Sequence, residues 1–367
     1  MKIDHQHRKI LCNAKRVVVK AGSKVLVQRS GRPDRTRMKK LIAELTHLHK
    51  TGVDTALVSS GAIGVGLDAL QQRTRPSDIA ELQMAASIGQ HRLMSIYDDL
   101  FSKSKCTIGQ VLLTHDVLQD QVRHLNARNT LLHLIANNVI PIINENDTIS
   151  TEEIKFGDND VVAALVAILI DADALILLST TDGLREPTAS GRTRRVSYID
   201  EIDDSILAMI EDKQDGLSTG GMTSKLQSAE LAAHNGIPVV IANGRKDGVL
   251  EQILRGEDEG TLLFPKNKQI SKYKRWIAFF NKVEGKITID EQTEKALNND
   301  NSLLLGGILK QEGNFKLGSM VEIINQDGTT IGRGLVEANS QELAFRNSSN
   351  TPAKEQPIIH HDNLVLL

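Results

Sequence analysis

Residues 218–244 place two glycines, several hydroxyl side chains and one lysine directly before a long helical pattern. A glycine-rich turn leading into a helix presents free backbone N–H groups, and the helix dipole adds partial positive charge there. Lys225, in the first turn, is unfavourable unless an anion lies beside it. The segment therefore favours a phosphate-type anion site. The alternative is an ordinary helix N-cap at Ser218 or Thr219 with a solvated lysine.

Other polar groups follow the short apolar segments that the sequence predicts as strands. In open parallel sheets, ligands bind at the carboxyl ends of the strands, so these groups are expected to converge. The acids and amides between Asn144 and Asp160 suit an ammonium group, or Mg²⁺ that arrives with a nucleotide; the alternative is a set of turns and helix caps. The groups are Lys20 and Gly22; Ser59 to Ala62; Asn144, Asn146 and Asp147; Lys155 and Asp158 to Asp160; and Ser179, Thr180 and Asp182.

Two common phosphate-binding motifs are excluded. The chain has no GxxxxGK[ST] sequence, and "SGAIGVG" at 60–66 lacks the GxGxxG spacing. The two cysteines, Cys12 and Cys106, show no metal-ligand spacing, and we expect no protein-built metal site and reduced thiols in a cytoplasmic protein. Two lysines and two glycine-rich turns remain as a cradle for a polyphosphate.

Composition points to an ordinary globular protein of more than one domain. The 367 residues are 40% apolar and 25% charged, with a net charge of -2 and only 3% aromatic residues. Neither nucleic acid nor an anionic membrane is therefore expected as the main partner. The longest apolar run, residues 161–178, contains Asp171 and Asp173 and predicts a buried helix followed by a buried strand. The first residues lack the apolar core of a signal peptide.

The order of elements predicts an α/β fold, a mainly parallel open sheet sandwiched by helices, over residues 1–264. A basic, aperiodic linker is expected at 265–276, a small, mostly β domain at 277–350 and a C-terminal tail at 351–367. Within the small domain, residues 320–336 predict a hairpin that turns at Asp327-Gly328.

Five segments together resemble glutamate 5-kinase, a member of the amino acid kinase superfamily. They are "VVVKAGSKVL", "LVSSGAIGVG", "HLNARNTL", "PIINENDTISTEEIKFGDND" and "LSTGGMTSKLQSAELAAHNGIPVVIANG". The match covers nearly the whole chain, and residues 277–350 are similar to the PUA domain of many bacterial members. The resemblance implies the amino acid kinase fold and transfer of the ATP γ-phosphoryl group to the side-chain carboxylate of L-glutamate, the first step of proline biosynthesis.

The resemblance also implies roles for single residues. Lys20 and Lys225 would be the catalytic lysines, held in place by Asp160. The glutamate-binding residues would be Ser60, Asp147 and Asn159, with Asp158 close by. The nucleotide, with its Mg²⁺, would contact Lys20, Gly22, Gly61, Ser179, Thr180, Thr219, Gly220, Gly221, Met222, Thr223, Ser224 and Lys225.

Three positions depart from the family pattern. Lys24 stands where Ser or Thr is usual, Thr180 stands where an aspartate is usual, with Asp182 as a candidate to compensate, and Asn129 replaces another aspartate. Of the contacts that the resemblance implies, those between the nucleotide and the segment at Thr180 are the most affected by these departures.

Implied partners are L-proline as feedback inhibitor, a second copy of the chain in a dimer or tetramer, and glutamate-5-semialdehyde dehydrogenase. Kinases of the same superfamily for acetylglutamate, aspartate, carbamate or uridylate remain alternatives. RNA binding by the small domain also remains, although 12 Lys or Arg against 12 Asp or Glu in 268–367 disfavours it.

Overall fold

The computed structural model describes residues 7–28, 30–114, 121–149, 159–188, 192–210, 221–264, 283–297, 301–348 and 357–366. The chain divides into two compact units, one holding most of residues 1–268 and the other holding residues 269–367. The expected linker, 265–276, lies outside the described residues.

The first unit is built on an eight-stranded sheet in the order β3-β4-β2-β1-β5-β9-β10-β8. The first six strands in this order, β3, β4, β2, β1, β5 and β9, run parallel, whereas β10 is antiparallel to β9. The chain leaves β1 toward β2 on one side and later returns to β5 on the other, so the carboxyl ends of β1 and β5 border the crevice where such sheets bind ligands. The strands are β1 (Arg16–Ala21), β2 (Asp54–Val58), β3 (Thr107–Leu113), β4 (Val139–Glu145), β5 (Ala174–Ser179), β8 (Tyr198–Ile199), β9 (Val239–Asn243) and β10 (Thr261–Leu263), with a separate pair β6 (Arg185–Pro187) and β7 (Thr193–Arg195).

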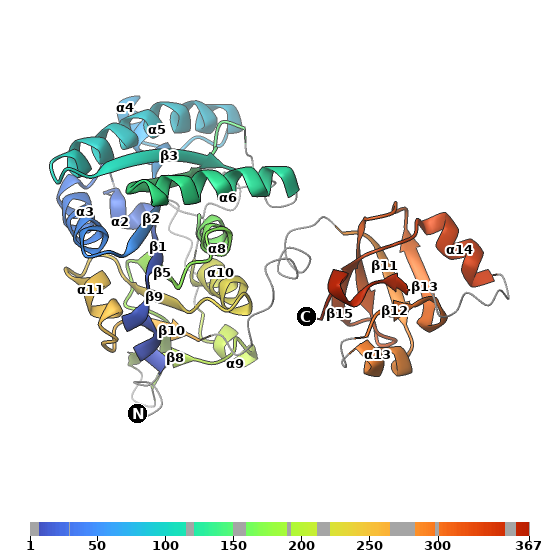
Figure 1. The fold of residues 1–367 in the computed structure, drawn as a ribbon. Coiled ribbons are helices and arrows are strands. Elements are labelled where there is room, and N and C mark those ends of the chain that lie inside the picture. The colour runs from blue at the N-terminus through green and yellow to red at the C-terminus, as the bar shows by residue number, and fades with distance from the viewer. Residues whose placement is uncertain are drawn as a thin grey trace. The chain divides into compact units, whose positions relative to one another are not determined.

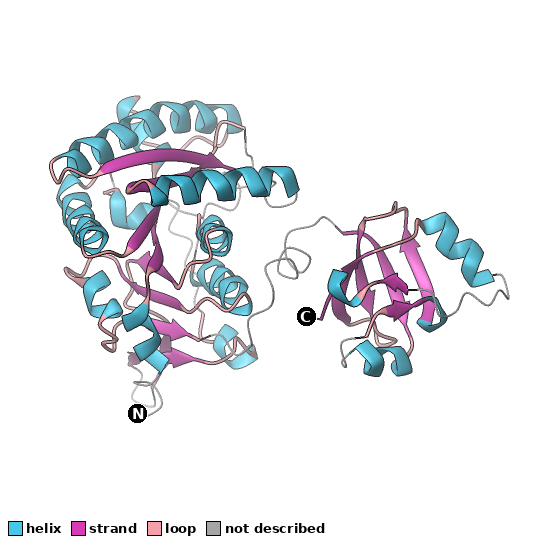
Figure 2. Ribbon diagram, in the orientation of Figure 1, coloured by secondary structure: helices cyan, strands magenta, loops and turns pink. Residues whose placement is uncertain are grey.

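Helices cover both faces of this sheet, as Figure 2 shows. Helices α3 and α11 lie along one face, and α8 and α10 along the other (Figure 1). Because side chains alternate along a strand, Val17, Val19 and Ala21 of β1 enter the core under α3, whereas Lys20 points to the face that α8 covers. The helices are η1 (Lys9–Asn13), α2 (Ser23–Leu26), α3 (Arg35–Lys50), α4 (Ala62–Ala69), α5 (Ile79–Ser102), α6 (Gln121–Ala136), α8 (Asp160–Leu169), α9 (Asp204–Leu207), α10 (Met222–His234) and α11 (Val249–Leu254).

Helices α4 and α5 cross with their backbones in contact, because small residues face each other there. A Cβ added to Gly66 would lie 1.7 Å from the carbonyl oxygen of Ala85, and one added to Gly89 would lie 1.8 Å from that of Ala62. Ala62 is the first residue of α4, which follows the polar turn at the end of β2. This crossing therefore fixes where that turn lies.

We expect Gly89→Ala to destabilise the first unit by about 1–3 kcal/mol or more, because the added methyl group must separate α4 from α5. The matched control is Gly64→Ala on α4, where a Cβ would make ordinary contacts with Val27 at 3.5 Å and the Gly31 carbonyl oxygen at 4.0 Å. That change replaces a helix glycine by alanine and should leave the free energy of unfolding unchanged or raise it. Urea unfolding measures this free energy for both variants, and equal values would contradict the close crossing.

The second unit contains a five-stranded sheet in the order β13-β11-β14-β15-β17 and a two-stranded pair, β12-β16. Its core includes Ile287, Val321, Ile323 and Ile359. Residues expected to form a tail beyond 350 include β16 and β17, which pair with β12 and β15. The elements are β11 (Val283–Ile289), α13 (Glu291–Leu297), β12 (Leu303–Leu304), η3 (Leu305–Gly307), β13 (Ile308–Gly313), β14 (Met320–Ile324), β15 (Thr330–Leu335), α14 (Ser340–Ser348), β16 (Pro357–Ile359), η5 (His361–Asn363) and β17 (Leu364–Leu366).

Several expectations from the sequence are confirmed. The sheet is mainly parallel with helices on both faces, and the second unit is mostly β. The apolar run at 161–178 forms the buried helix α8 and the strand β5. The hairpin joins β14 to β15, with Gly328 at a φ of 84° in its turn. No helix among the described residues combines the length and apolar character needed to cross a bilayer.

Candidate active site

Two lysines from distant parts of the sequence share one buried carboxylate. Lys20 Nζ lies 2.6 Å from Asp160 Oδ1, and Lys225 Nζ lies 2.8 Å from Asp160 Oδ2. Asp160 is fully buried, and Lys20 and Lys225 are only 1% and 7% exposed. Lys20 comes from the carboxyl end of β1, while Asp160 and Lys225 come from the first turns of α8 and α10. The sequence-predicted pair of lysines is therefore brought together, with Asp160 between them.

The position of Lys225 excludes one of the two interpretations of its segment. Helix α10 begins at Met222 with Gly221 as the N-cap residue, and Gly221 provides no side-chain cap. Lys225 is buried, so the solvated-lysine interpretation is wrong. The anion beside it is the Asp160 carboxylate, which offsets a cation at a helix N-terminus.

Asn159 occupies the N-cap position of α8, yet its side chain does not cap the helix. An N-cap asparagine ordinarily accepts a hydrogen bond from the first turn through its side-chain oxygen. Here Asn159 Nδ2 instead donates to the backbone oxygen of Ser59, at 2.6 Å, and to Oδ1 of Asn144. Asn159 is fully buried, and its Oδ1 has no hydrogen-bond partner among the described residues. A helix cap therefore does not explain this side chain.

Two polar side chains of α5, Gln90 and Tyr97, form hydrogen bonds with residues at the ends of β4 and β2. Neither of them was identified from the sequence. Asn144 Nδ2 donates to Gln90 Oε1 at 2.7 Å, and Ser59 Oγ lies 2.7 Å from the hydroxyl of Tyr97. Burial raises the pKa of the Tyr97 hydroxyl, so it stays protonated. Gln90 and Tyr97 are seven residues apart, two turns along α5. Polar groups at helical spacing on an otherwise apolar face were the signal available in the sequence.

Ser60 and Asp147, the other expected glutamate ligands, are also buried at the strand ends. Ser60 follows β2 by two positions, and its Oγ has no partner among the described residues. Asp147 follows β4 by two positions and is 6% exposed. A buried polar atom without a partner costs stability, so Ser60 Oγ is a candidate for contact with a ligand.

Two glycines lie in the turns after β1 and β2, next to the lysine site. A Cβ added to Gly22 would lie 3.6 Å from Lys20 Nζ and 3.5 Å from the carbonyl oxygen of Leu178, so the backbone at Gly22 lies close to the Lys20 ammonium group. Gly61 has a φ of 99°, which favours glycine, and it is the N-cap residue of α4. A Cβ there would contact Val27 at 2.7 Å, so the turn after β2 packs against the segment after β1.

The expected nucleotide residues are only partly placed. Ser179 ends β5 beside Asn243 of β9, and Thr180 follows it at the surface. Met222, Thr223 and Ser224 form the first turn of α10 with Gly221 before them. Thr219, Gly220 and Asp158 lie outside the described residues.

Asp182 was expected to compensate for the missing acid at Thr180. Both of its carboxylate oxygens instead accept hydrogen bonds from Nη1 of Arg185, each at 2.7 Å. This ion pair is about two-fifths exposed. At Lys24, another of the departures, the backbone oxygen accepts a hydrogen bond from Arg245. The carboxylate of Asp182 is therefore paired with Arg185, which argues against its replacing the aspartate that is usual at position 180.

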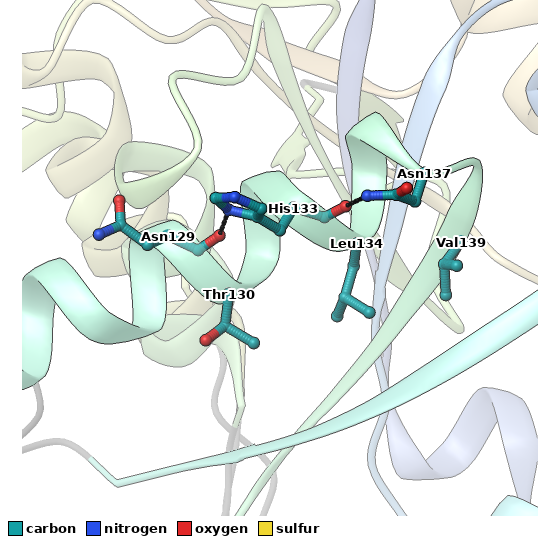
Figure 3. Close-up of a pocket in the computed structure, with 6 residues that line it drawn as sticks. All are labelled: Asn129, Thr130, His133, Leu134, Asn137 and Val139. Carbon is teal, nitrogen blue, oxygen red and sulfur yellow. Dashed lines mark hydrogen bonds between the residues drawn. The ribbon is translucent and has the colours of Figure 1, made fainter.

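An open hollow of about 440 Å³ lies elsewhere on the first unit, against α6 (Figure 3). Val139, the first residue of β4, lines it, so the hollow is at the opposite end of that strand from Asn144. The polar groups there bond within α6: His133 Nδ1 with the Asn129 oxygen, and Asn137 Nδ2 with the His133 oxygen. The hollow is therefore separate from the lysine site.

The chain is similar to known proteins over nearly its whole length. The model of the amino acid kinase family matches residues 15–243, and that of the PUA domain matches residues 285–349. A glutamate 5-kinase from Thermoanaerobacter sp. (strain X514) is 38% identical over 363 residues, 96% of this chain and 98% of that protein. The glutamate 5-kinase of Methylococcus capsulatus is 40% identical over 372 residues, 98% of this chain and 100% of that protein.

These alignments extend over nearly the full length of both chains, so they span both the first unit and the small second unit. The resemblance drawn from five sequence segments is confirmed. The chain belongs to the glutamate 5-kinases of the amino acid kinase family and carries a C-terminal PUA domain.

Proposed function

We propose that the protein transfers the terminal phosphoryl group of ATP to the side-chain carboxylate of L-glutamate, giving L-glutamyl 5-phosphate and ADP. A glutamate oxygen forms a bond to the γ-phosphorus as the bond from that phosphorus to the bridging β-γ oxygen breaks. The acceptor carboxylate is already ionised at neutral pH, so the reaction requires no general base. This reaction is the first step of proline biosynthesis.

The convergence of Lys20 and Lys225 on Asp160 is the observation that carries the proposal. Two anions must approach each other, so the main obstacle is their repulsion. Fixed positive groups in a site with little water stabilise the charge that spreads over the transferring phosphoryl group. Asp160 holds both ammonium groups in place before substrate binds, which lowers the reorganisation that catalysis requires.

Recognition of glutamate is assigned to buried polar atoms at the ends of β2 and β4. The Asp147 carboxylate and Asn159 Oδ1 suit the α-ammonium group, because both are hydrogen-bond acceptors. Ser60 opens the turn before α4, whose backbone N–H groups suit the α-carboxylate. Asp158 joins this set by its position in the sequence.

ATP is assigned to the opposite side of the lysine pair, along Gly22, Gly61, Ser179, Thr180 and the segment 219–225. The closeness of the Gly22 backbone to Lys20 and the N-cap glycine of α10, Gly221, support this assignment, because free backbone N–H groups at a helix start suit a phosphate. Mg²⁺ bound to the nucleotide would supply further positive charge. Both oxygens of Asp160 contact lysines, so we assign no protein ligand to the metal.

The reaction can be tested by measuring ADP release with L-glutamate, N-acetylglutamate, L-aspartate, carbamate and UMP as acceptors. We expect L-glutamate to be preferred and hydroxylamine to trap an acyl phosphate. Preference for another acceptor would assign the chain to a different reaction of the same family.

We expect Asn159→Ala to raise the KM for glutamate much more than the KM for ATP, because the lost Oδ1 belongs to the glutamate side of the site. A lost hydrogen bond to a charged group corresponds to roughly a tenfold to 100-fold effect. Steady-state kinetics with each substrate varied in turn measures the two constants. An unchanged KM for glutamate would remove Asn159 from the binding site.

The remaining parts of the proposal concern regulation and context. Proline would compete in or near the glutamate site, the chain would assemble as a dimer or tetramer in the cytoplasm, and glutamate-5-semialdehyde dehydrogenase would consume the labile acyl phosphate. Gel filtration and an assay with added L-proline test the first two points.

A further inference from the structure

Gln90 lies on α5, behind the strand ends, and has no assigned role in the reaction. It is partly buried, and its Oε1 accepts a 2.7 Å hydrogen bond from Asn144 Nδ2. The backbone crossing at neighbouring Gly89 brings this part of α5 up to the start of α4. Gln90 is therefore the outermost member of a chain of amides that runs through Asn144 to Asn159.

The direction of each hydrogen bond in this chain follows from one fixed acceptor. The backbone oxygen of Ser59 cannot donate, so the Asn159 atom 2.6 Å from it must be Nδ2. The same Nδ2 faces Asn144, which must then present its oxygen. The Asn144 amide nitrogen is consequently turned toward α5, where Gln90 supplies the acceptor it needs.

This chain determines which atom of the Asn159 amide remains available to a ligand. Both donor positions of the Asn159 amide are used inside the protein. The fully buried Oδ1, which can only accept, has no hydrogen-bond partner among the residues that the structure describes. An acceptor in that position favours a ligand with a hydrogen-bond donor, such as an ammonium group. If Asn144 turned its nitrogen toward Asn159, two N–H groups would face each other and the arrangement would be lost.

We propose that Gln90 is a positioning residue that determines selectivity for the α-ammonium group of the substrate: by holding Asn144, it keeps Asn159 Oδ1 directed to the ligand as an acceptor. The inference rests on the proposed function, because it takes L-glutamate as the ligand. Gln90 acts through Asn144 and Asn159 and is not assigned any contact with the reacting atoms.

The test compares Gln90→Leu with the native protein, using L-glutamate and glutarate, the same dicarboxylate without the ammonium group. Gln90→Leu leaves the Asn144 N–H without its acceptor, and a buried unpaired donor corresponds to roughly a fivefold to 100-fold effect. We expect the KM for L-glutamate to rise by that factor, the preference for L-glutamate over glutarate to fall, and the KM for ATP to stay unchanged. Calorimetric titration with each dicarboxylate in the absence of ATP should show the same loss of preference.

Two further variants separate positioning from a structural effect. Gln90→Glu keeps an acceptor oxygen and should retain a preference for L-glutamate close to the native one. Gln83→Leu makes the same change two turns earlier on α5, at another partly buried position, and should alter neither preference nor KM. If Gln90→Leu folds poorly, the unbranched Gln90→Met tests the same loss of acceptor.

An unchanged preference for L-glutamate over glutarate in Gln90→Leu or Gln90→Met would overturn the inference, as would equal damage in Gln90→Glu. Failure of the proposed function has a different signature, because the native protein itself would then neither phosphorylate nor prefer L-glutamate.

Discussion

Replacing Lys225 by alanine is expected to lower kcat by roughly two to four orders of magnitude, the range for removal of one preorganised electrostatic group. Its ammonium group is buried, held 2.8 Å from Asp160, and lies at the start of α10, where the phosphates are assigned. The fold should persist, because Asp160 retains its contact with Lys20. Initial rates at saturating ATP and L-glutamate, with circular dichroism to verify folding, measure the effect.

The matched control for this variant is Lys40→Ala. Lys40 is also paired with a carboxylate that two cations share, Asp247, but half of its side chain is exposed. Exposed ion pairs contribute little, so this variant should keep native kinetics and stability. A folded Lys225→Ala protein with near-native turnover would exclude Lys225 from the mechanism.

The second large effect is expected for Asp160→Asn. Asparagine has the same shape, but it can offer an acceptor to only one lysine, and its NH₂ group then faces the other ammonium group. Two buried cations would lose their shared anion, and removing one partner of a buried ion pair costs about 3–5 kcal/mol. We expect the free energy of unfolding to fall by that amount and turnover to fall by at least as much as in Lys225→Ala. Urea unfolding and initial rates measure the two effects.

Asp247→Asn is the matched control, because Asp247 is likewise shared between two cations, Arg37 and Lys40. Its side chain is 61% exposed, so solvent screens the pair and the variant should behave like the native protein. If Asp160→Asn were as stable and as active as Asp247→Asn, the buried lysine pair would not depend on its carboxylate. Loss of stability with full residual turnover would leave Asp160 a structural role only.

The sequence alone determined those features that depend on local patterns. Strands such as β1 and β5 are short apolar runs, α3 and α5 repeat apolar residues at helical spacing, and the Asp327-Gly328 turn joins two β segments. Glycine-rich turns beside Lys20 and Lys225 are also local signals of an anion site. The family could be identified because five such segments occur together in one order.

Only the tertiary structure decided what each polar side chain contacts. Asn159 occupies a helix N-cap position that predicts a local cap, yet its Nδ2 donates instead to a carbonyl directly after β2 and to an amide oxygen of β4. Gln90 and Tyr97 lie on a helix whose pattern indicates only a buried face, and their partners come from two different strands. The contacts of Lys20 and Lys225 with the same carboxylate, that of Asp160, likewise require the order of strands around β1. Such contacts depend on which segments the fold brings together, and this depends on packing of the whole sheet, which no local spacing encodes.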